Sequence, residues 1–211
     1  MRMIAEIRHL PRRSSRREIQ LDNGEAFTLD LALVARRRLA VGTRLTEEEL
    51  EALRQEDEWT RAKASGFDML RARLFSRKEL TDKLRRKGYS AEAVERAVSA
   101  IEELGYISDE EYAEAFVESR LRSKPKGRYA LRRELRQKGI DKLTIERTLR
   151  AVSDEDEREA ALNLARKQMR LYRNLPRETA RRRLYQYLMR RGYRYEDVSA
   201  AMRDVFGGDS D

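Results

Sequence analysis

The chain has 211 residues, of which 47 are Lys or Arg and 38 are Asp or Glu, so its formal net charge is +9. It contains no cysteine, which excludes disulfides, thiolate metal sites and cysteine nucleophiles. The longest apolar run, 31–35, is far shorter than a membrane span, and no signal-peptide core follows Met1. We therefore expect a cytoplasmic protein without a membrane segment, and the positive excess favours a polyanion or an acidic protein as partner.

The first 30 residues have the pattern of strands. Apolar side chains alternate with polar ones in two stretches, at Met3, Ala5 and Ile7 and again at Ile19 and Leu21. The basic stretch 11–17 between them is typical of an exposed turn, and Asp22-Asn23-Gly24 is typical of a hairpin turn. A helical pattern follows over 30–38. Thr46, with Glu49 three residues later, then indicates a capping box that opens another helix.

Beyond residue 55 the pattern is helical and repeats about every 50 residues. We predict a mostly α protein with an N-terminal β-hairpin region and short helices at 1–55. Three-helix repeats follow at 56–104, 105–153 and 154–211, as an elongated array of tandem modules. The middle helices are expected at 76–87, 127–138 and 176–191. The predicted N-caps are Ser76, Ser90, Ser108, Asp141 and Ser153.

A glycine follows each middle helix and marks the repeat, at Gly88, Gly139 and Gly192. The buried columns are Leu80, Leu131 and Leu184 eight residues before each glycine, Leu84, Leu135 and Leu188 four residues before it, and Val94, Ile145 and Val198 six residues after it. Glycine after a basic residue at a helix end is typical of a left-handed C-cap. We therefore interpret the three glycines as scaffold.

The face of each middle helix opposite this apolar stripe is basic. The candidate partner-binding residues are Arg85, Arg86, Lys87, Arg132, Arg133, Arg136, Lys138, Arg182, Arg190 and Arg191. Lys87, Lys138 and Arg191 lie nearer the stripe, so their stems are expected to cover apolar surface while the charge reaches water. Any one of these residues has an alternative interpretation as a solvated cation paired with a nearby glutamate.

Tyr185 and Tyr195 are the candidates for stacking nucleic-acid bases, because bases stack on aromatic rings whatever their sequence. Catalytic chemistry is poorly represented. His9 is the only histidine, no glycine-rich phosphate loop occurs, and the carboxylates gather at helix starts rather than converging from several elements. We expect no catalytic residues, no metal and no cofactor.

Several motifs resemble the RecX family of bacterial RecA regulators. They are Phe75-Ser76-Arg77-Lys78-Glu79-Leu80, Leu84-Arg85-Arg86-Lys87-Gly88-Tyr89, the stretch from Glu103 to Ala113, Phe116-Val117-Glu118-Ser119-Arg120, and the stretch from Leu131 to Ile140. The resemblance is clearest over 60–152, and the third repeat departs from it at Tyr187 and Met189.

The resemblance implies a non-enzymatic protein of three-helix modules, with the RecA recombinase filament and single-stranded DNA as partners. Such a protein binds in the filament groove and modulates, by inhibition above all, ATP hydrolysis, strand exchange and filament growth in homologous recombination, DNA repair and the SOS response. We expect this chain to act as a monomer. The alternatives are a direct DNA-binding protein with tandem helical modules and a scaffold for acidic proteins. Double-stranded DNA as a partner and the direction of the effect stay open.

Overall fold

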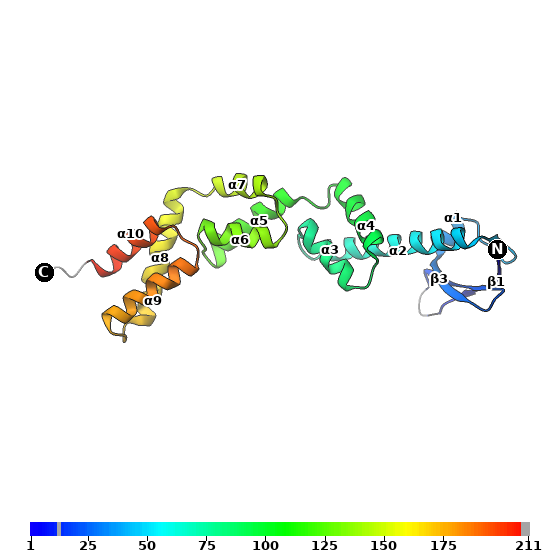
Figure 1. Ribbon diagram of the computed structural model, residues 1–211, viewed down its shortest axis with the longest axis horizontal. Coiled ribbons are helices and arrows are strands. Elements are labelled where there is room, and N and C mark those ends of the chain that lie inside the picture. The colour runs from blue at the N-terminus through cyan, green and yellow to red at the C-terminus, as the bar shows by residue number, and fades with distance from the viewer. Residues whose placement is uncertain (12–13, 208–211) are drawn as a thin grey trace. The chain divides into compact units, whose positions relative to one another are not determined.

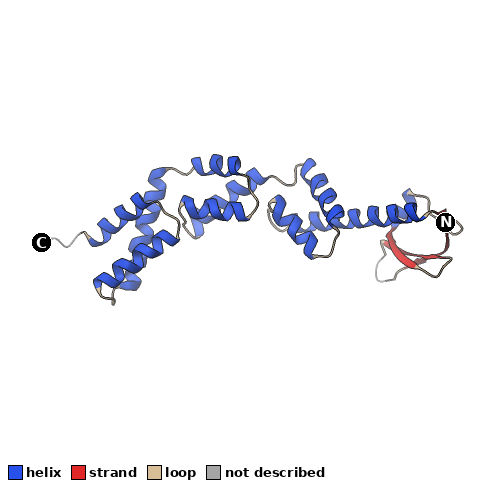
Figure 2. Cartoon of the chain, in the orientation of Figure 1, coloured by secondary structure: helices blue, strands red, loops and turns tan. Residues whose placement is uncertain are grey.

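The computed structural model describes residues 1–11 and 14–207 (Figure 1). The chain begins with an antiparallel sheet of the order β3-β2-β1-β4. Its strands are β1 (Arg2–His9), β2 (Arg16–Leu21), β3 (Ala26–Asp30) and the short β4 (Arg44–Leu45). Gly24 has a φ of 85° in the turn between β2 and β3, which confirms the predicted hairpin. Figure 2 shows that the strands are confined to this N-terminal part.

The alternation in β1 differs from the one expected. Ile4 is fully buried, whereas Met3 and Ala5 are exposed. The pairing of β1 with β2 shifts register between Ile4 and Glu6. An irregularity of this kind interrupts the period of two, so the simple alternation assigned Met3 and Ala5 to the wrong face.

Two helices complete the N-terminal core. Helix α1 (Leu31–Arg36) begins at Asp30, whose side chain accepts the Ala32 N–H, and α2 (Glu47–Leu70) begins with the predicted capping box of Thr46 and Glu49. Leu50 and Leu53 of α2 pack into the core beneath the sheet. The helix continues without interruption through 55/56, where the sequence pattern placed a boundary.

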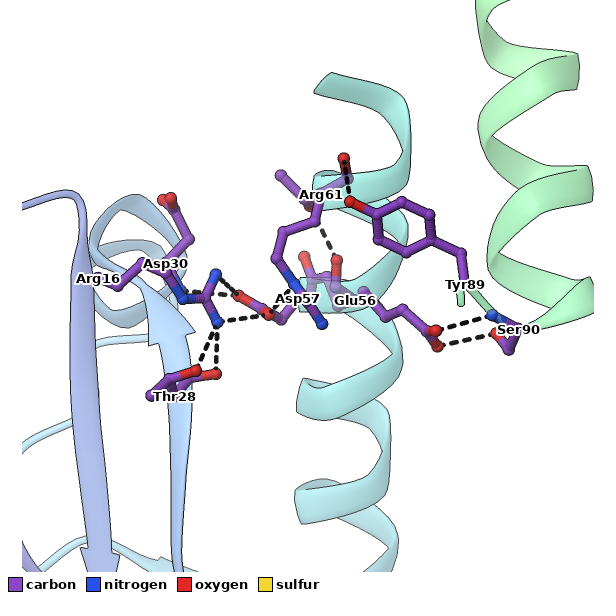
Figure 3. A network of polar contacts seen from close by, with 10 residues as sticks. Arg16, Thr28, Asp30, Glu56, Asp57, Arg61, Tyr89 and Ser90 are labelled. Carbon is purple, nitrogen blue, oxygen red and sulfur yellow. Dashed lines mark hydrogen bonds and ion pairs between the residues drawn. The ribbon is translucent and has the colours of Figure 1, made fainter. Parts of the chain in front are cut away.

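A buried carboxylate ties the sheet to α2. The side chain of Asp57 is only 3% exposed and accepts hydrogen bonds from Arg16 (2.8 Å), Arg61 (2.9 Å) and the Asp30 N–H (2.7 Å). Figure 3 shows Arg16 and Arg61 approaching Asp57 from opposite sides. Hydrogen bonds from charged groups to a carboxylate are strong. The contacts of Asp57 therefore hold β2 and β3 against α2.

The rest of the described chain is helical, which confirms the predicted class. The remaining helices are α3 (Arg77–Arg86), α4 (Ala91–Glu103), α5 (Asp109–Ser123), α6 (Arg128–Gln137), α7 (Lys142–Arg150), α8 (Asp154–Tyr172), α9 (Arg177–Arg190) and α10 (Tyr195–Phe206). The five predicted capping side chains, Ser76, Ser90, Ser108, Asp141 and Ser153, all accept a first-turn amide. The leucines of the two columns before the glycines are completely buried.

The chain forms two compact units. Residues 1–73 and 80–106 make up the first, and residues 74–79 and 107–211 make up the second. In the second unit, separate apolar clusters form around Leu131 and Leu135 and around Leu184 and Leu188. Across the described residues, no helix combines the length and the apolar character that crossing a membrane would require.

Candidate nucleic-acid interface

The three repeat-marking glycines adopt the left-handed conformation expected of C-caps. Their φ angles are 91° at Gly88, 86° at Gly139 and 81° at Gly192. Gly139 and Gly192 have a second role that the sequence did not reveal. A Cβ on Gly192 would lie 2.3 Å from the Ala130 nitrogen, and one on Gly139 would lie 2.5 Å from the Lys78 Cβ, whereas a Cβ on Gly88 would meet nothing within 4 Å.

These two glycines allow close contact with the start of another helix in the second unit. At Gly192, the Gly127 N–H donates to the Arg191 carbonyl (3.0 Å) and the Tyr129 N–H donates to the Gly192 carbonyl (3.1 Å). At Gly139, the Ser76 hydroxyl donates to the Lys138 carbonyl (2.7 Å). The loop after a middle helix therefore receives the first residues of the preceding middle helix, and we call this contact the glycine joint.

A carboxylate from a first helix completes each joint. The Arg77 N–H donates to Asp109 (2.8 Å), and in the equivalent position the Arg128 N–H donates to Glu157 (2.8 Å). Asp109 begins α5 and Glu157 lies in the first turn of α8. A carboxylate from one element thus accepts an orphan amide at the start of another helix.

The Glu157 carboxylate is the buried centre of the second joint. Its side chain is 2% exposed and lies 3.2 Å from the Arg128 Nε and 3.8 Å from the Arg194 Nε. Burial raises the pKa of Glu157 above the ordinary carboxyl value, although both arginines act in the opposite direction. Ionisation of Glu157 in the joint is therefore opposed by the loss of its hydration.

Five of the ten candidate cations have partners within the protein. Arg132 forms two hydrogen bonds to Glu146 (2.7 and 2.9 Å), which lower the pKa of that carboxyl, and Lys138 pairs with Glu79 (2.6 Å). Arg191 donates to the Tyr187 hydroxyl (2.9 Å). The other two are Lys87, which donates to the Ser65 hydroxyl, and Arg86, which donates to the Asp82 carbonyl of its own helix. Arg132 and Lys138 thus contribute to the scaffold.

The remaining five candidates are exposed and offer their charge to solvent. They are Arg85 on α3, Arg133 and Arg136 on α6, and Arg182 and Arg190 on α9. Within the described ranges 1–11 and 14–207, their guanidinium groups form no hydrogen bond or ion pair with the protein. Sequence alone could not separate Arg133 from its neighbour Arg132, because only the packing of α7 on α6 places Glu146 beside one of them.

The two tyrosines predicted to stack on bases line one groove between α9 and α10. Tyr185 is 38% exposed and Tyr195 is 63% exposed. The groove has a volume of about 610 Å³ and is lined by Arg177, Glu178, Arg181, Arg182, Tyr185, Tyr195, Ser199, Met202, Arg203, Phe206 and Gly207. Arg181 and Arg203 were not among the predicted residues. Arg181 precedes Tyr185 by four residues and Arg203 follows Tyr195 by eight. Each arginine therefore shares a helical face with its tyrosine, and this spacing could have indicated both.

The fold is that of a helical protein built from tandem three-helix modules. Sequence models of the first, second and third three-helix domains of RecX match residues 62–99, 108–149 and 154–202. The chain therefore belongs to the RecX family. Where the structure describes the chain, no three His, Cys, Asp or Glu side chains are grouped as a metal ion would require.

The similarity extends over nearly the whole chain. The regulatory protein RecX of Clostridium botulinum (strain Eklund 17B / Type B) is 28% identical, over 97% of both chains. That of Bacillus subtilis (strain 168) is 29% identical, over 97% of this chain and 78% of the relative. A crystal structure of a regulatory protein RecX covers 97% of this chain and is itself covered completely, with a TM-score of 0.73 and 28% identity. RecX from Lactobacillus salivarius, at 24% identity and a TM-score of 0.62 over 71% of this chain and 97% of its own, shares the fold.

Proposed function

We propose that this protein regulates the RecA recombinase by binding, as a single chain in the cytoplasm, in the groove of the RecA filament on single-stranded DNA. Its effect there is to limit ATP hydrolysis, strand exchange and filament growth. Membership of the RecX family supports the regulatory role. The observation that carries the choice of surface is that the middle helices α3, α6 and α9 each hold exposed arginines whose guanidinium groups have no partner among the described residues.

The pairing of the other cations strengthens this choice. Arg132 and Lys138 are engaged by Glu146 and Glu79 and hold helices together. The guanidinium groups of Arg85 and Arg136, each three residues before its glycine, make no hydrogen bond or ion pair with the described residues, so their removal should not disturb the fold. A surface cation without a structural partner remains available to steer the protein toward an acidic surface or a phosphate backbone.

A direct DNA-binding protein is the second candidate, favoured by the groove that contains Tyr185 and Tyr195. The two functions differ in what provides the affinity. A direct binder holds bare DNA tightly and loses affinity steeply with salt, because each neutralised phosphate releases counterions. A filament regulator acts on the recombinase at amounts below equimolar.

The test is the single-stranded-DNA-dependent ATPase of RecA in the presence of the double variant Arg133→Glu, Arg136→Glu. Arg132 is left intact because its loss would leave Glu146 unpaired. We expect the wild-type protein to suppress the ATPase and the variant to need at least about tenfold more protein for the same effect, because two contacts become repulsive. Circular dichroism should show unchanged helicity.

The matched control is Lys142→Glu, Arg150→Glu on α7, which changes the net charge by the same amount on another helix. Both side chains are exposed. We expect this variant to inhibit like the wild type. Equal loss in both variants would show a general charge effect, and full inhibition by the α6 variant would show that α6 does not contact the filament.

A further inference from the structure

The groove between α9 and α10 combines aromatic rings with unpaired cations. On α9, Arg181 and Arg182 lie three and four residues after Glu178 and four and three residues before Tyr185, so these side chains share a face. On α10, Ser199 lies four residues after Tyr195, and Met202 and Arg203 lie three and four residues after Ser199, so these side chains also share a face. Both helices pack on α8 and on each other (Figure 1), so the two faces line a fixed groove.

The groove contains more arginines than the contacts within the fold engage. Arg177 donates to the Phe206 carbonyl (2.7 Å) and thereby fixes the end of α10. The side chains of Arg181, Arg182 and Arg203 are exposed, and their guanidinium groups make no hydrogen bond or ion pair to any residue the structure describes. Among the described residues that line the groove, Glu178 is the one acidic residue, so their net charge is positive and suits an anionic ligand.

We propose that this groove binds single-stranded DNA, with bases stacked on Tyr185 and Tyr195 and phosphates held by Arg181, Arg182 and Arg203. Exposed aromatic rings beside guanidinium groups match an alternation of base and phosphate. A duplex fits less well, because its bases are already stacked on one another and present only their edges.

This inference rests on the proposed function, since a protein that acts on a filament formed on single-stranded DNA meets that strand. It adds a direct DNA contact in the third module to the contacts that α6 makes with the filament. The two contacts can be separated, because the groove is measured without recombinase and α6 is measured through the ATPase.

The experiment is fluorescence anisotropy of a short labelled oligothymidylate with the full chain, in the absence of RecA. We expect Tyr185→Ala and Tyr195→Ala each to weaken binding by roughly 5- to 100-fold, whereas Tyr185→Phe and Tyr195→Phe keep the affinity within about twofold because the ring is retained. The matched control is Tyr129→Ala on α6, whose side chain is 60% exposed, similar to Tyr195. It should bind like the wild type.

The roles of Arg182 and Arg203 are tested separately, through the salt dependence of the affinity. Arg182→Gln and Arg203→Gln should each lower the slope of log affinity against log salt by about 0.7, the value for one phosphate contact on a single strand. Unchanged affinity in both tyrosine-to-alanine variants, equal loss in Tyr129→Ala, or equal wild-type affinity for a duplex of the same length would overturn the proposal. Tight oligonucleotide binding by a protein that leaves the RecA ATPase unchanged would contradict the proposed function and support this site.

Discussion

At the scale of residues, the protein buries two carboxylates, Asp57 and Glu157, and compensates their negative charges to different degrees. Asp57 accepts hydrogen bonds from two arginines and a backbone amide, so its charge is well compensated (Figure 3). Glu157 accepts the Arg128 N–H, but its Oε2 accepts no hydrogen bond from the described residues. The raised pKa of Glu157 reflects this incomplete solvation.

We expect the contribution of Glu157 to stability to fall as pH rises. Because its pKa is higher in the folded protein than in the unfolded chain, the folded protein binds the proton more tightly, and the cost of ionisation is fully present only above the raised pKa. The Glu157→Gln variant keeps the acceptor for the Arg128 N–H and lacks the charge. Its melting temperature minus that of the wild type should therefore increase from the ordinary carboxyl range up through the raised pKa.

Glu134 provides a control of opposite sign. Burial opposes its ionisation, but hydrogen bonds from Lys126 and Arg120 prevail and lower the pKa of Glu134. The wild type gains stability relative to Glu134→Gln as pH rises from that lowered pKa to the ordinary value. Parallel pH curves for the two variants would contradict this assignment.

At the scale of elements, local signals predicted the helices well. Ser90, Ser108, Asp141 and Ser153 cap helices as their sequence positions indicated, because a cap depends on a few neighbouring residues. The glycine joint was not predictable, because Gly88, Gly139 and Gly192 follow the same local pattern and differ only in what another segment places beside them. The continuity of α2 across 55/56 was not predicted, because the sequence was divided there at the expected start of the first repeat.

The three equivalent glycines give an internal test of the joint. Gly88→Ala should cost only the left-handed conformation, about 1–2 kcal/mol. Gly192→Ala adds a clash with the Ala130 backbone and should cost about 1–3 kcal/mol more. Hydrogen exchange at the Tyr129 amide, which donates to the Gly192 carbonyl, reports the joint directly.

We expect that amide to lose protection in Gly192→Ala and to keep it in Gly88→Ala. The contrast between the two variants removes the effect of the φ angle, since both positions are left-handed. Equal protection in the two variants would mean that the close approach at Gly192 does not stabilise the contact between α6 and the loop that precedes α10.

At the scale of the molecule, the net charge of +9 predicted an anionic partner but not the surface that meets it. Seven of the ten candidate cations lie within α3, α6 and α9, and Lys87, Lys138 and Arg191 follow directly after these helices. It could not show that Arg132 and Lys138 serve the scaffold while Arg133 and Arg136 do not, because that depends on Glu146 and Glu79 from other segments. The division into paired and unpaired cations is what the structure adds.

The most direct test compares the affinity of the wild-type protein for an assembled RecA filament on an oligonucleotide with its affinity for the same oligonucleotide alone. We predict at least about tenfold tighter binding to the filament, because protein contacts through α6 are added to those with DNA. We also predict that Arg133→Glu, Arg136→Glu abolishes this preference. Equal affinity for filament and bare strand, with a steep salt dependence in both, would contradict regulation by filament binding and establish a direct DNA-binding protein instead.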